Sequence, residues 1–338
     1  MPAFSDLLIA RPPRAVDTLD LDTLERGGLH RLRVAISRDG VGNDVRVPVI
    51  VARGAEDGPV VGITAAVHGN ELNGIPTIHR LVRTLDVAAL KGTVVGVPVV
   101  NVPGYLRNIR EFHDGRDLNR LFPGAPAGNG AQVYAHAIMT RIVKHFGVLV
   151  DLHTASFGRV NSLYIRADLS DPRVARYARL IGPQIIVHNP RGDGTLRGAA
   201  SASGICALTV EVGDPQRLQR SLTKTSGLGI RNIIEDLGMI APDAWDGDQD
   251  PVICSSSYWT YTDEGGLLDV LPKLAQTVAK DEVVAHLFDP WGARIAIYRA
   301  PEDGIVIGKS TNPVADVGAR ILHLGKVAPP GTEFPPRT

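Results

Sequence analysis

Between residues 59 and 237 short apolar runs alternate with amphipathic stretches, and this alternation restricts the fold more than any other feature of the chain. Runs such as residues 59–67 (PVVGITAAV) are β-branched and apolar on both faces, which is typical of strands covered on both sides. The pattern therefore predicts an α/β domain whose mixed, largely parallel sheet is flanked by helices. We expect strands at 59–67, 92–101, 148–153 and 206–213, and helices at 74–85, 131–146, 172–180 and 218–237.

Two further regions flank this domain. An alternating stretch and a second strand-like run within residues 29–53 surround a GVGND turn signal, which predicts a β hairpin. Residues 241–252 (APDAWDGDQDPV) have the composition of a linker, and the segments after them alternate strand and turn signals. We expect an N-terminal β-rich extension (1–45), a main domain (46–240) and a small all-β domain of barrel-sandwich type (250–338).

Charge and cysteine content limit the classes of function. The chain has 36 basic and 36 acidic residues and no Lys/Arg-rich run, which argues against nucleic acid or an anionic membrane as its partner. No apolar run approaches the roughly 20 residues of a membrane span, and the first residues do not resemble a signal peptide. The two cysteines, Cys206 and Cys254, lie in different segments and are expected to be free thiols. We expect a cytoplasmic protein with a small-molecule partner, and the apolar β tail is compatible with a homo-oligomer.

Two expected strands end in histidine-containing polar segments. His68 and Glu71 lie in HGNELNG (68–74), and His153 ends the run VLVDLH. In open α/β sheets ligands bind at the carboxyl ends of strands, and two imidazoles with one carboxylate are the donors of a catalytic zinc site. Asp151 lies on the same face as His153, where it could orient the imidazole. The alternative is that both are ordinary strand-end histidines.

Other charged residues complete a candidate active site. Glu211 lies inside the apolar run ALTVEVG, where burial would raise its pKa and suit it to act as a general base. A salt-bridged core glutamate is the alternative. The loop 109–124 carries Arg110, Arg116, Asn119 and Arg120, and guanidinium and amide groups suit a substrate carboxylate. A solvated charged loop is the competing interpretation.

Four motifs together resemble a known family. HGNE (68–71), DLNRLFPG (117–124), DLHT (151–154) and EVG (211–213) resemble the succinylglutamate desuccinylase/aspartoacylase family, a branch of the zinc carboxypeptidase-like hydrolases. The motifs occur in the family order, and members carry a C-terminal β domain beside the active site. The DGRDLNRLFPG form resembles the bacterial branch that includes N-acetyl-diaminobutyrate deacetylase.

The resemblance implies a role for the metal-site candidates. His68, Glu71 and His153 correspond to the ligands of one zinc ion per chain. Glu211 corresponds to the general base that activates the zinc-bound water and then protonates the leaving amine.

It also implies roles for the loop residues. Arg110 corresponds to the residue that polarises the scissile carbonyl, with Arg116 as a rival because the spacing to DLNR differs from that in aspartoacylase. Asn119 and Arg120 correspond to the clamp on the α-carboxylate of the substrate.

The function expected from these residues is removal of an acyl group, of acetyl or succinyl type, from an N-acyl-amino acid. A zinc carboxypeptidase-type hydrolase of a peptide-like amide is the alternative enzyme, and a catalytically inactive binding protein of the same fold is the non-enzymatic one. Further candidates for contacts with the acyl or side-chain end are Arg159, Tyr164, Arg166, Arg191, Tyr258 and Tyr261.

Overall fold

The computed structural model describes residues 12–190, 194–242 and 250–335, and the elements named below lie in these ranges. Apolar runs rich in β-branched residues form the strands, and segments with apolar residues every three or four positions form the helices. The expected linker at 241–252 lies mostly outside the described residues.

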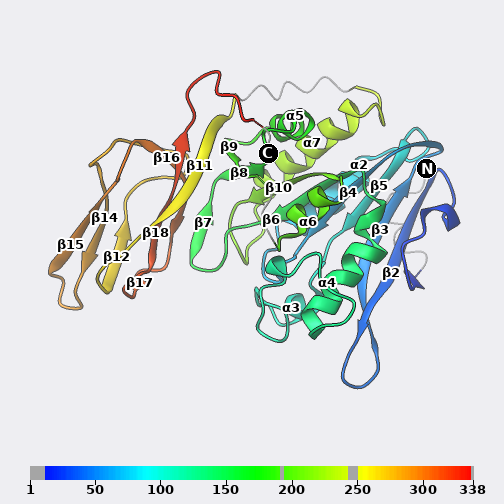
Figure 1. Ribbon diagram of the computed structural model, residues 1–338, viewed down its shortest axis with the longest axis horizontal. Coiled ribbons are helices and arrows are strands. Elements are labelled where there is room, and N and C mark those ends of the chain that lie inside the picture. The colour runs from blue at the N-terminus through cyan, green and yellow to red at the C-terminus, as the bar shows by residue number, and fades with distance from the viewer. Residues whose placement is uncertain (1–11, 191–193, 243–249, 336–338) are drawn as a thin grey trace.

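A mixed sheet runs through the centre of the molecule and continues into its C-terminal region (Figure 1). Four strands in its middle, β5, β4, β6 and β10, are parallel. Beyond them, β8 adds an antiparallel strand on one side and β3 does so on the other. In spatial order the strands are β1 (Arg14–Val16), β2 (Gly28–Arg38), β3 (Asp44–Arg53), β5 (Lys91–Val97), β4 (Glu56–Ala65), β6 (Val148–His153), β10 (Cys206–Val212), β8 (Leu163–Ala167), β9 (Ile185–His188), β11 (Val252–Tyr261), β18 (Arg320–Val327), β16 (Gly304–Ser310) and β13 (Thr277–Val278), with β7 (Arg159–Asn161) paired to β16.

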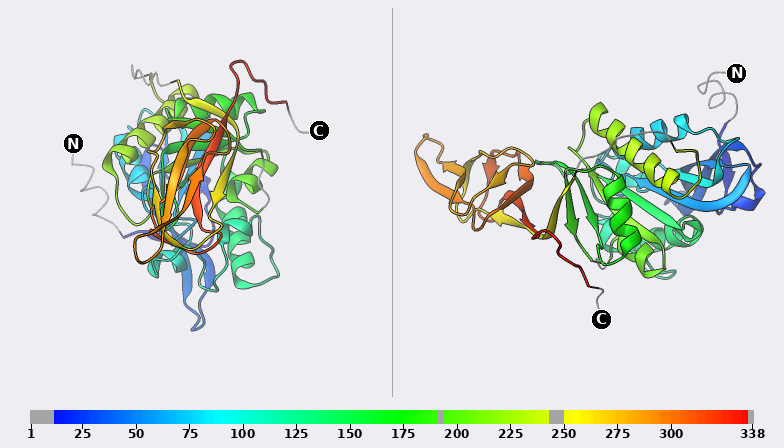
Figure 2. Two further views of the ribbon diagram at one scale, coloured as in Figure 1. Left: turned by 90° about the vertical axis from the view of Figure 1, so that its left-hand side faces the viewer. Right: turned by 90° about the horizontal axis from the view of Figure 1, so that it is seen from above.

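Helices cover both faces of this sheet (Figure 2). α2, α5 and α7 contribute to one apolar cluster, and α4 and α6 contribute to a second cluster on the other face. The expected mixed α/β fold with flanking helices is therefore confirmed. The helices are α2 (Gly74–Thr84), α3 (Val102–Leu106), α4 (Gly130–Arg141), α5 (Pro172–Leu180), α6 (Leu196–Ala202) and α7 (Arg220–Asp236), and short 3-10 turns lie at Leu21–Thr23, Leu118–Arg120 and Val143–His145.

Several elements differ from the expected set. The hairpin of β2 and β3 does more than decorate the main domain, because β3 pairs with β5 and extends the main sheet. The strands β7, β8 and β9 and the helix α6 were not predicted. These strands have three to five residues, too few for a periodic pattern to stand out.

The C-terminal region carries a second, antiparallel sheet, which confirms the expected small β domain. Its strands surround a separate apolar cluster. The region is joined to the main domain by two backbone pairings, β9 with β11 and β7 with β16, and by a buried cluster that includes Tyr164, Cys254 and Ile307. We call this contact the domain junction. The second sheet consists of β15 (Arg294–Arg299), β14 (Val283–Phe288), β12 (Gly266–Val270) and β17 (Val314–Ala315).

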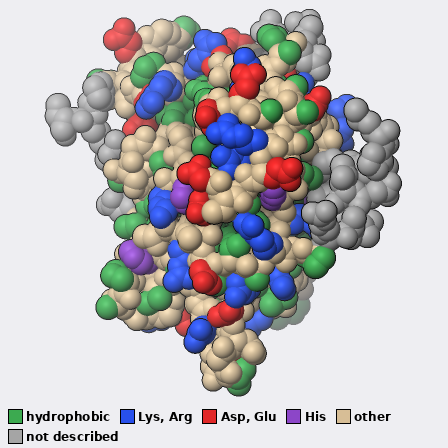
Figure 3. All heavy atoms as spheres, turned by 90° about the vertical axis from the view of Figure 1, so that its right-hand side faces the viewer, with side chains coloured by type: hydrophobic (Ala, Val, Ile, Leu, Met, Phe, Trp, Pro, Cys, Tyr) green, Lys and Arg blue, Asp and Glu red, His purple; other side chains and the backbone are tan. Residues whose placement is uncertain are grey.

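The surface fits the balanced composition. On the face shown in Figure 3, acidic and basic side chains are interspersed. Among the helices of the described residues, none combines the length and apolar character that a membrane crossing requires.

Asn73 ties the start of α2 to the end of β10. Its side chain does not cap the helix; it donates to the carbonyl of Val212 at 2.8 Å and to Oε1 of Gln219 at 2.9 Å. The backbone amide of Gln219 in turn donates to Asn73 Oδ1 at 2.9 Å. Asn73 is fully buried, and its bond to the Val212 carbonyl is buried as well, while the bonds with Gln219 are part-buried.

We predict that Asn73→Ala lowers the free energy of unfolding by about 1–3 kcal/mol, because it removes the donor to the buried Val212 carbonyl and the acceptor of the Gln219 backbone amide. Chemical denaturation measures this value. The control is Asn43→Ala, at an exposed hairpin position, which should change stability by no more than about 0.5 kcal/mol. Equal effects of the two variants would contradict the role of Asn73 as a link between α2 and β10.

Candidate metal centre and active site

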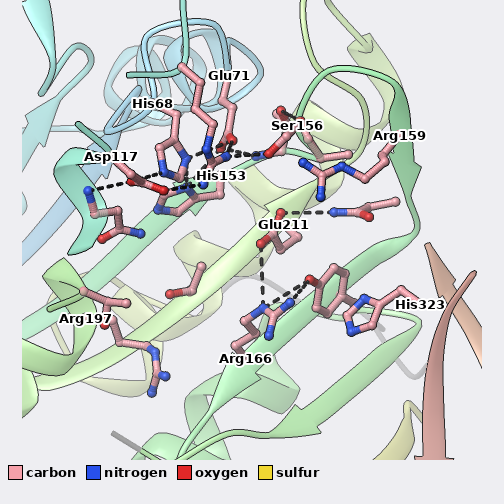
Figure 4. A pocket seen from close by; sticks show the side chains of 18 of the residues that line it. His68, Glu71, Asp117, His153, Ser156, Arg159, Arg166, Arg197, Glu211 and His323 are labelled. Atoms are coloured by element: carbon pink, nitrogen blue, oxygen red, sulfur yellow. Dashed lines mark hydrogen bonds and ion pairs between the residues drawn. The ribbon is translucent and has the colours of Figure 1, made fainter. Parts of the chain in front are cut away.

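Three side chains meet at the carboxyl ends of β4 and β6. Nδ1 of His68 lies 2.8 Å from Oε1 of Glu71, and Nδ1 of His153 lies 3.0 Å from Oε2 of Glu71. The two Nδ1 atoms are 3.2 Å apart. All three side chains are buried, and Figure 4 shows them facing one another across the end of the sheet.

Close packing of the backbone brings the ligand-bearing segment into place. A Cβ atom at Gly69 would lie 2.1 Å from the carbonyl carbon of Gly104 and 2.2 Å from the amide nitrogen of Tyr105. Only glycine allows this approach between the segment after β4 and α3. Gly69 is therefore needed at this position because it has no side chain.

The second nitrogen of each imidazole is held by a carboxylate. Nε2 of His153 lies 2.9 Å from Asp151, which also accepts a 2.7 Å hydrogen bond from the Thr64 hydroxyl. Nε2 of His68 lies 3.0 Å from Asp117. A carboxylate accepts hydrogen bonds, so each Nε2 carries the proton and each Nδ1 of a neutral ring presents a lone pair.

These contacts test whether the three residues fit a metal ion. With both rings neutral, two Nδ1 lone pairs and a carboxylate converge on one point, an arrangement that suits a cation. Burial alone would lower the pKa of His153, but Asp151 and Glu71 raise it well above its usual value. The same negative field favours a divalent ion. Donors of a tetrahedral zinc site with bonds of about 2.0–2.1 Å lie about 3.3 Å apart, close to the spacing found here.

Glu211 lies beside this group on β10. It is the β-ladder neighbour of His153, and its side chain is 13% exposed. Asn161 donates to its Oε2 at 3.2 Å, and Nε of Arg166 is 3.8 Å from its Oε1. Burial raises the pKa of Glu211, and the nearby Glu71 adds to this effect, which outweighs Arg166 and the two histidines. A carboxylate with a raised pKa next to the candidate metal ligands can accept a proton and return it.

Arg110 enters the same cavity and is fixed by three partners. Its guanidinium donates to Glu71 Oε1 and Asp117 Oδ2, each at 2.9 Å, and to the Ser156 hydroxyl. Burial would lower the pKa of Arg110, but the carboxylates outweigh burial and raise it. The guanidinium is therefore a fixed, permanent positive charge beside the candidate metal ligands.

The other loop residues fall into two groups. Asn119 and Arg120 line the cavity, and Asn119 Oδ1 accepts a 2.8 Å bond from the Leu196 amide. Arg116 instead pairs with Asp114 at 2.7 Å on the exposed side of the loop, away from the residues that line the cavity.

The β domain forms the far wall of the cavity, which has a volume of about 610 Å³. The β domain contributes Trp259, Arg320 and His323 to this wall. The main domain contributes Arg159, Tyr164 and Arg166 opposite them. Tyr258 and Tyr261 were expected in this role. Tyr258 instead bonds Glu302, because side chains alternate along β11 and Trp259 lies on the inner face. Tyr261 is 52% exposed and follows an irregularity in the pairing of β11 with β18 between Trp259 and Tyr261. Arg191 lies outside the described residues.

Besides Trp259, Arg320 and His323, two residues of the main domain contribute to the site and were not predicted from the sequence. Asp117 orients His68 in the same way as Asp151 orients His153. The sequence carried a signal for this role, because a second candidate ligand histidine needs a second carboxylate and the DLNR motif begins with Asp117. Arg197 lies on α6, is 3% exposed and lines the cavity. Its guanidinium donates to the carbonyl and to Oδ1 of Asn189. No sequence pattern marked this residue.

Comparisons with known proteins agree with this architecture. Residues 57–237 match the succinylglutamate desuccinylase/aspartoacylase catalytic domain. The N-alpha-acetyl-L-2,4-diaminobutyric acid deacetylase of Halomonas elongata is 24% identical over 332 residues, covering 94% of this chain and 95% of that protein. The product-bound ectoine utilization protein EutE (DoeB) of Ruegeria pomeroyi has a TM-score of 0.80 and 21% identity, covering 90% of this chain and 97% of its own. A succinylglutamate desuccinylase/aspartoacylase of Rhodobacter sphaeroides has a TM-score of 0.79 and 25% identity, covering 92% and 98%.

Two imidazoles and a glutamate at the strand ends of an α/β sheet form a donor set that suits zinc, so fold and site define an α/β protein with a candidate metal centre. The family match specifies it further. The chain belongs to the succinylglutamate desuccinylase/aspartoacylase family, a family of deacylases that act on N-acyl amino acids.

We predict that the protein binds about one equivalent of zinc per chain and that His153→Ala reduces this content at least tenfold, because two ligands cannot hold the ion. Elemental analysis of dialysed protein measures the ratio. His286→Ala, on β14 of the β domain, is the control and should retain full zinc content.

The same experiment tests folding. Removal of the metal by a chelator should leave the circular dichroism spectrum unchanged, since the large apolar clusters on both faces of the sheet contain no candidate metal ligand, while the melting temperature falls. Full zinc content in His153→Ala would show that the ligand set is wrong.

Proposed function

We propose that this chain is a zinc-dependent amidohydrolase that removes an acyl group from an N-acyl-amino acid. The observation that carries the proposal is the convergence of His68, Glu71 and His153, with both outer imidazole nitrogens held by carboxylates, beside the largely buried Glu211. Zinc bound there would act as a Lewis acid and lower the pKa of a water molecule. The other tasks fall to side chains of this chain.

Glu211 is proposed as the general base and acid. It takes a proton from the attacking water as the oxygen adds to the carbonyl carbon, and it delivers that proton to the nitrogen as the C–N bond breaks. Its raised pKa suits both transfers. Arg110 is proposed to donate hydrogen bonds to the carbonyl oxygen as negative charge develops there, because its three partners hold it in place before the substrate arrives.

Asn119 and Arg120 are proposed to bind the α-carboxylate of the substrate. Their position in the cavity supports this role, and the ion pair of Arg116 with Asp114 favours Arg110 over Arg116 beside the carbonyl. A carboxypeptidase would use the same groups. The wall formed by Trp259 favours a small N-acyl-amino acid over a peptide. A cytoplasmic location remains a prediction.

We predict that Glu211→Gln lowers kcat by about 100- to 10,000-fold, because the amide cannot transfer the proton. Zinc content should stay unchanged. Release of free amine from N-acyl-amino acids measures the rate, and Glu264→Gln, at an exposed position in the β domain, is the control. Retained activity in Glu211→Gln would rule out the general-base role.

For the carboxylate clamp, we predict that Arg120→Ala raises KM by about 10- to 100-fold, the effect of losing a hydrogen bond to a charged group, with a smaller change in kcat. Steady-state kinetics with an N-acyl-amino acid measure both constants. Arg116→Ala is the matched control, because it removes the same charge from the same loop at an exposed arginine that pairs with Asp114, and it should leave KM unchanged. An unchanged KM in Arg120→Ala would place the carboxylate clamp elsewhere.

A further inference from the structure

Three polar side chains around Glu211 have no role in the proposed chemistry. The antiparallel pairing of β8 with β10 places Tyr164 directly opposite Glu211. Arg166 follows two residues later on β8, so its side chain shares a face of the sheet with those of Tyr164 and Glu211. Asn161, on β7, approaches the same carboxylate. Backbone pairing therefore gathers these groups around one side chain before any ligand binds.

The two oxygens of Glu211 have separate neighbours. Oε2 accepts a 3.2 Å hydrogen bond from the Asn161 side chain, and Oε1 lies 3.8 Å from Nε of Arg166. In Figure 4, Arg166 approaches Glu211 from the side away from His153. Arg166 therefore holds the carboxylate without lying between it and the candidate metal ligands.

Arg166 is itself held by Tyr164. Its Nε and Nη2 donate to the Tyr164 hydroxyl at 3.1 and 2.8 Å. A hydroxyl has two acceptor lone pairs and one proton, and a guanidinium has donors only, so the proton of this hydroxyl is left for another acceptor. Burial raises the pKa of Tyr164, and Glu211 raises it further by its charge and a hydrogen bond with the hydroxyl, against the opposite effect of Arg166. Tyr164 and Arg166 thus hold Glu211 as a unit.

The domain junction fixes both supports of Glu211. Asn161 is opposite Gly308 of β16, and a Cβ atom at Gly308 would lie 2.4 Å from Oδ1 of Asn161. The missing side chain of Gly308 therefore leaves the space that the Asn161 amide occupies. Tyr164 is 1% exposed and belongs to the buried cluster that also contains Ile307 of β16. Both groups are consequently backed by the same strand of the β domain.

We propose that Asn161, Tyr164 and Arg166, which we call the Glu211 cradle, are positioning residues that fix the Glu211 carboxylate for proton transfer. This inference rests on the proposed function, in which Glu211 is the general base and acid. A glutamate side chain has several staggered rotamers, whereas proton transfer needs the carboxylate within hydrogen-bond distance of the attacking water. The cradle selects one arrangement. Through it, the β domain acts on a reacting group as well as forming the cavity wall.

The first test measures kcat and KM of cradle variants in the zinc-loaded full chain, by release of free amine from an N-acyl-amino acid. Arg166→Gln should lower kcat about 10- to 100-fold and change KM by less than about threefold, because a displaced base fails in the reaction and not in binding. Tyr164→Phe keeps the ring in the buried cluster and should lower kcat about 3- to 30-fold, as should Asn161→Ala, the effect of one hydrogen bond. Zinc content should stay unchanged.

A double-mutant cycle separates positioning from other roles. A residue that acts only through Glu211 should have no further effect once Glu211 is Gln, so Arg166→Gln should change the residual kcat of Glu211→Gln by less than about twofold. A contact with the substrate, or a general loss of structure, would persist in that background. Arg176→Gln is the matched control, because it breaks an exposed ion pair with Asp236 on α5 and should leave kcat unchanged in both backgrounds.

The failures of the two proposals are distinct. If the wild type releases no amine from N-acyl-amino acids, or Glu211→Gln keeps full activity, the proposed function is overturned and the cradle with it. If Glu211→Gln loses activity while Arg166→Gln and Tyr164→Phe keep the wild-type kcat, only the cradle is overturned. A raised KM with unchanged kcat in Arg166→Gln would make Arg166 a substrate contact instead. Equal losses of kcat in the two backgrounds would also overturn the positioning role.

Discussion

The parallel pairing of β4, β6 and β10 is the constraint on which the active site depends. Main-chain hydrogen bonds place Thr64 beside Asp151 and Glu211 beside His153. Side chains alternate between the faces of a sheet, so a slip of one residue in either ladder would turn these groups to the opposite face. The register therefore aligns His153, the candidate metal ligand, with its supporting carboxylate and with Glu211, the proposed general base, and the buried middle strands hold that alignment.

The charges gathered at this strand edge would be costly to bury singly. The imidazoles and Arg110 donate to Glu71, Asp117 and Asp151, which offsets the burial of these carboxylates and joins them in one network. The network still has a net demand for positive charge between the two Nδ1 atoms. Stability and metal affinity are consequently linked, because an ion that satisfies this demand binds the folded chain and not the unfolded one.

Local patterns predicted the main-domain fold and candidate site residues at or near the ends of its strands. His68 and His153 stand where an apolar run gives way to polar residues, and Glu211 is a single carboxylate inside such a run. Contacts that depend on long-range pairing could not be predicted. Trp259 was overlooked in favour of Tyr258 because alternation along β11 does not reveal which face is inner until its pairing with β18 is known. The strands β8 and β9 were missed because runs of five and four residues are too short for a periodic pattern to stand out.

The sheet that crosses the domain junction also bears on how the protein can diversify. Backbone pairing and a buried apolar cluster hold the far wall of the cavity in place before any ligand arrives, so little conformational entropy is lost there when a ligand binds. Substitutions on the inner faces of β11 and β18 can reshape that wall while the reacting groups stay fixed on β6 and β10. The proposed catalytic residues and the residues that shape the far wall of the cavity therefore lie on different strands, so the wall can change while the catalytic residues are kept.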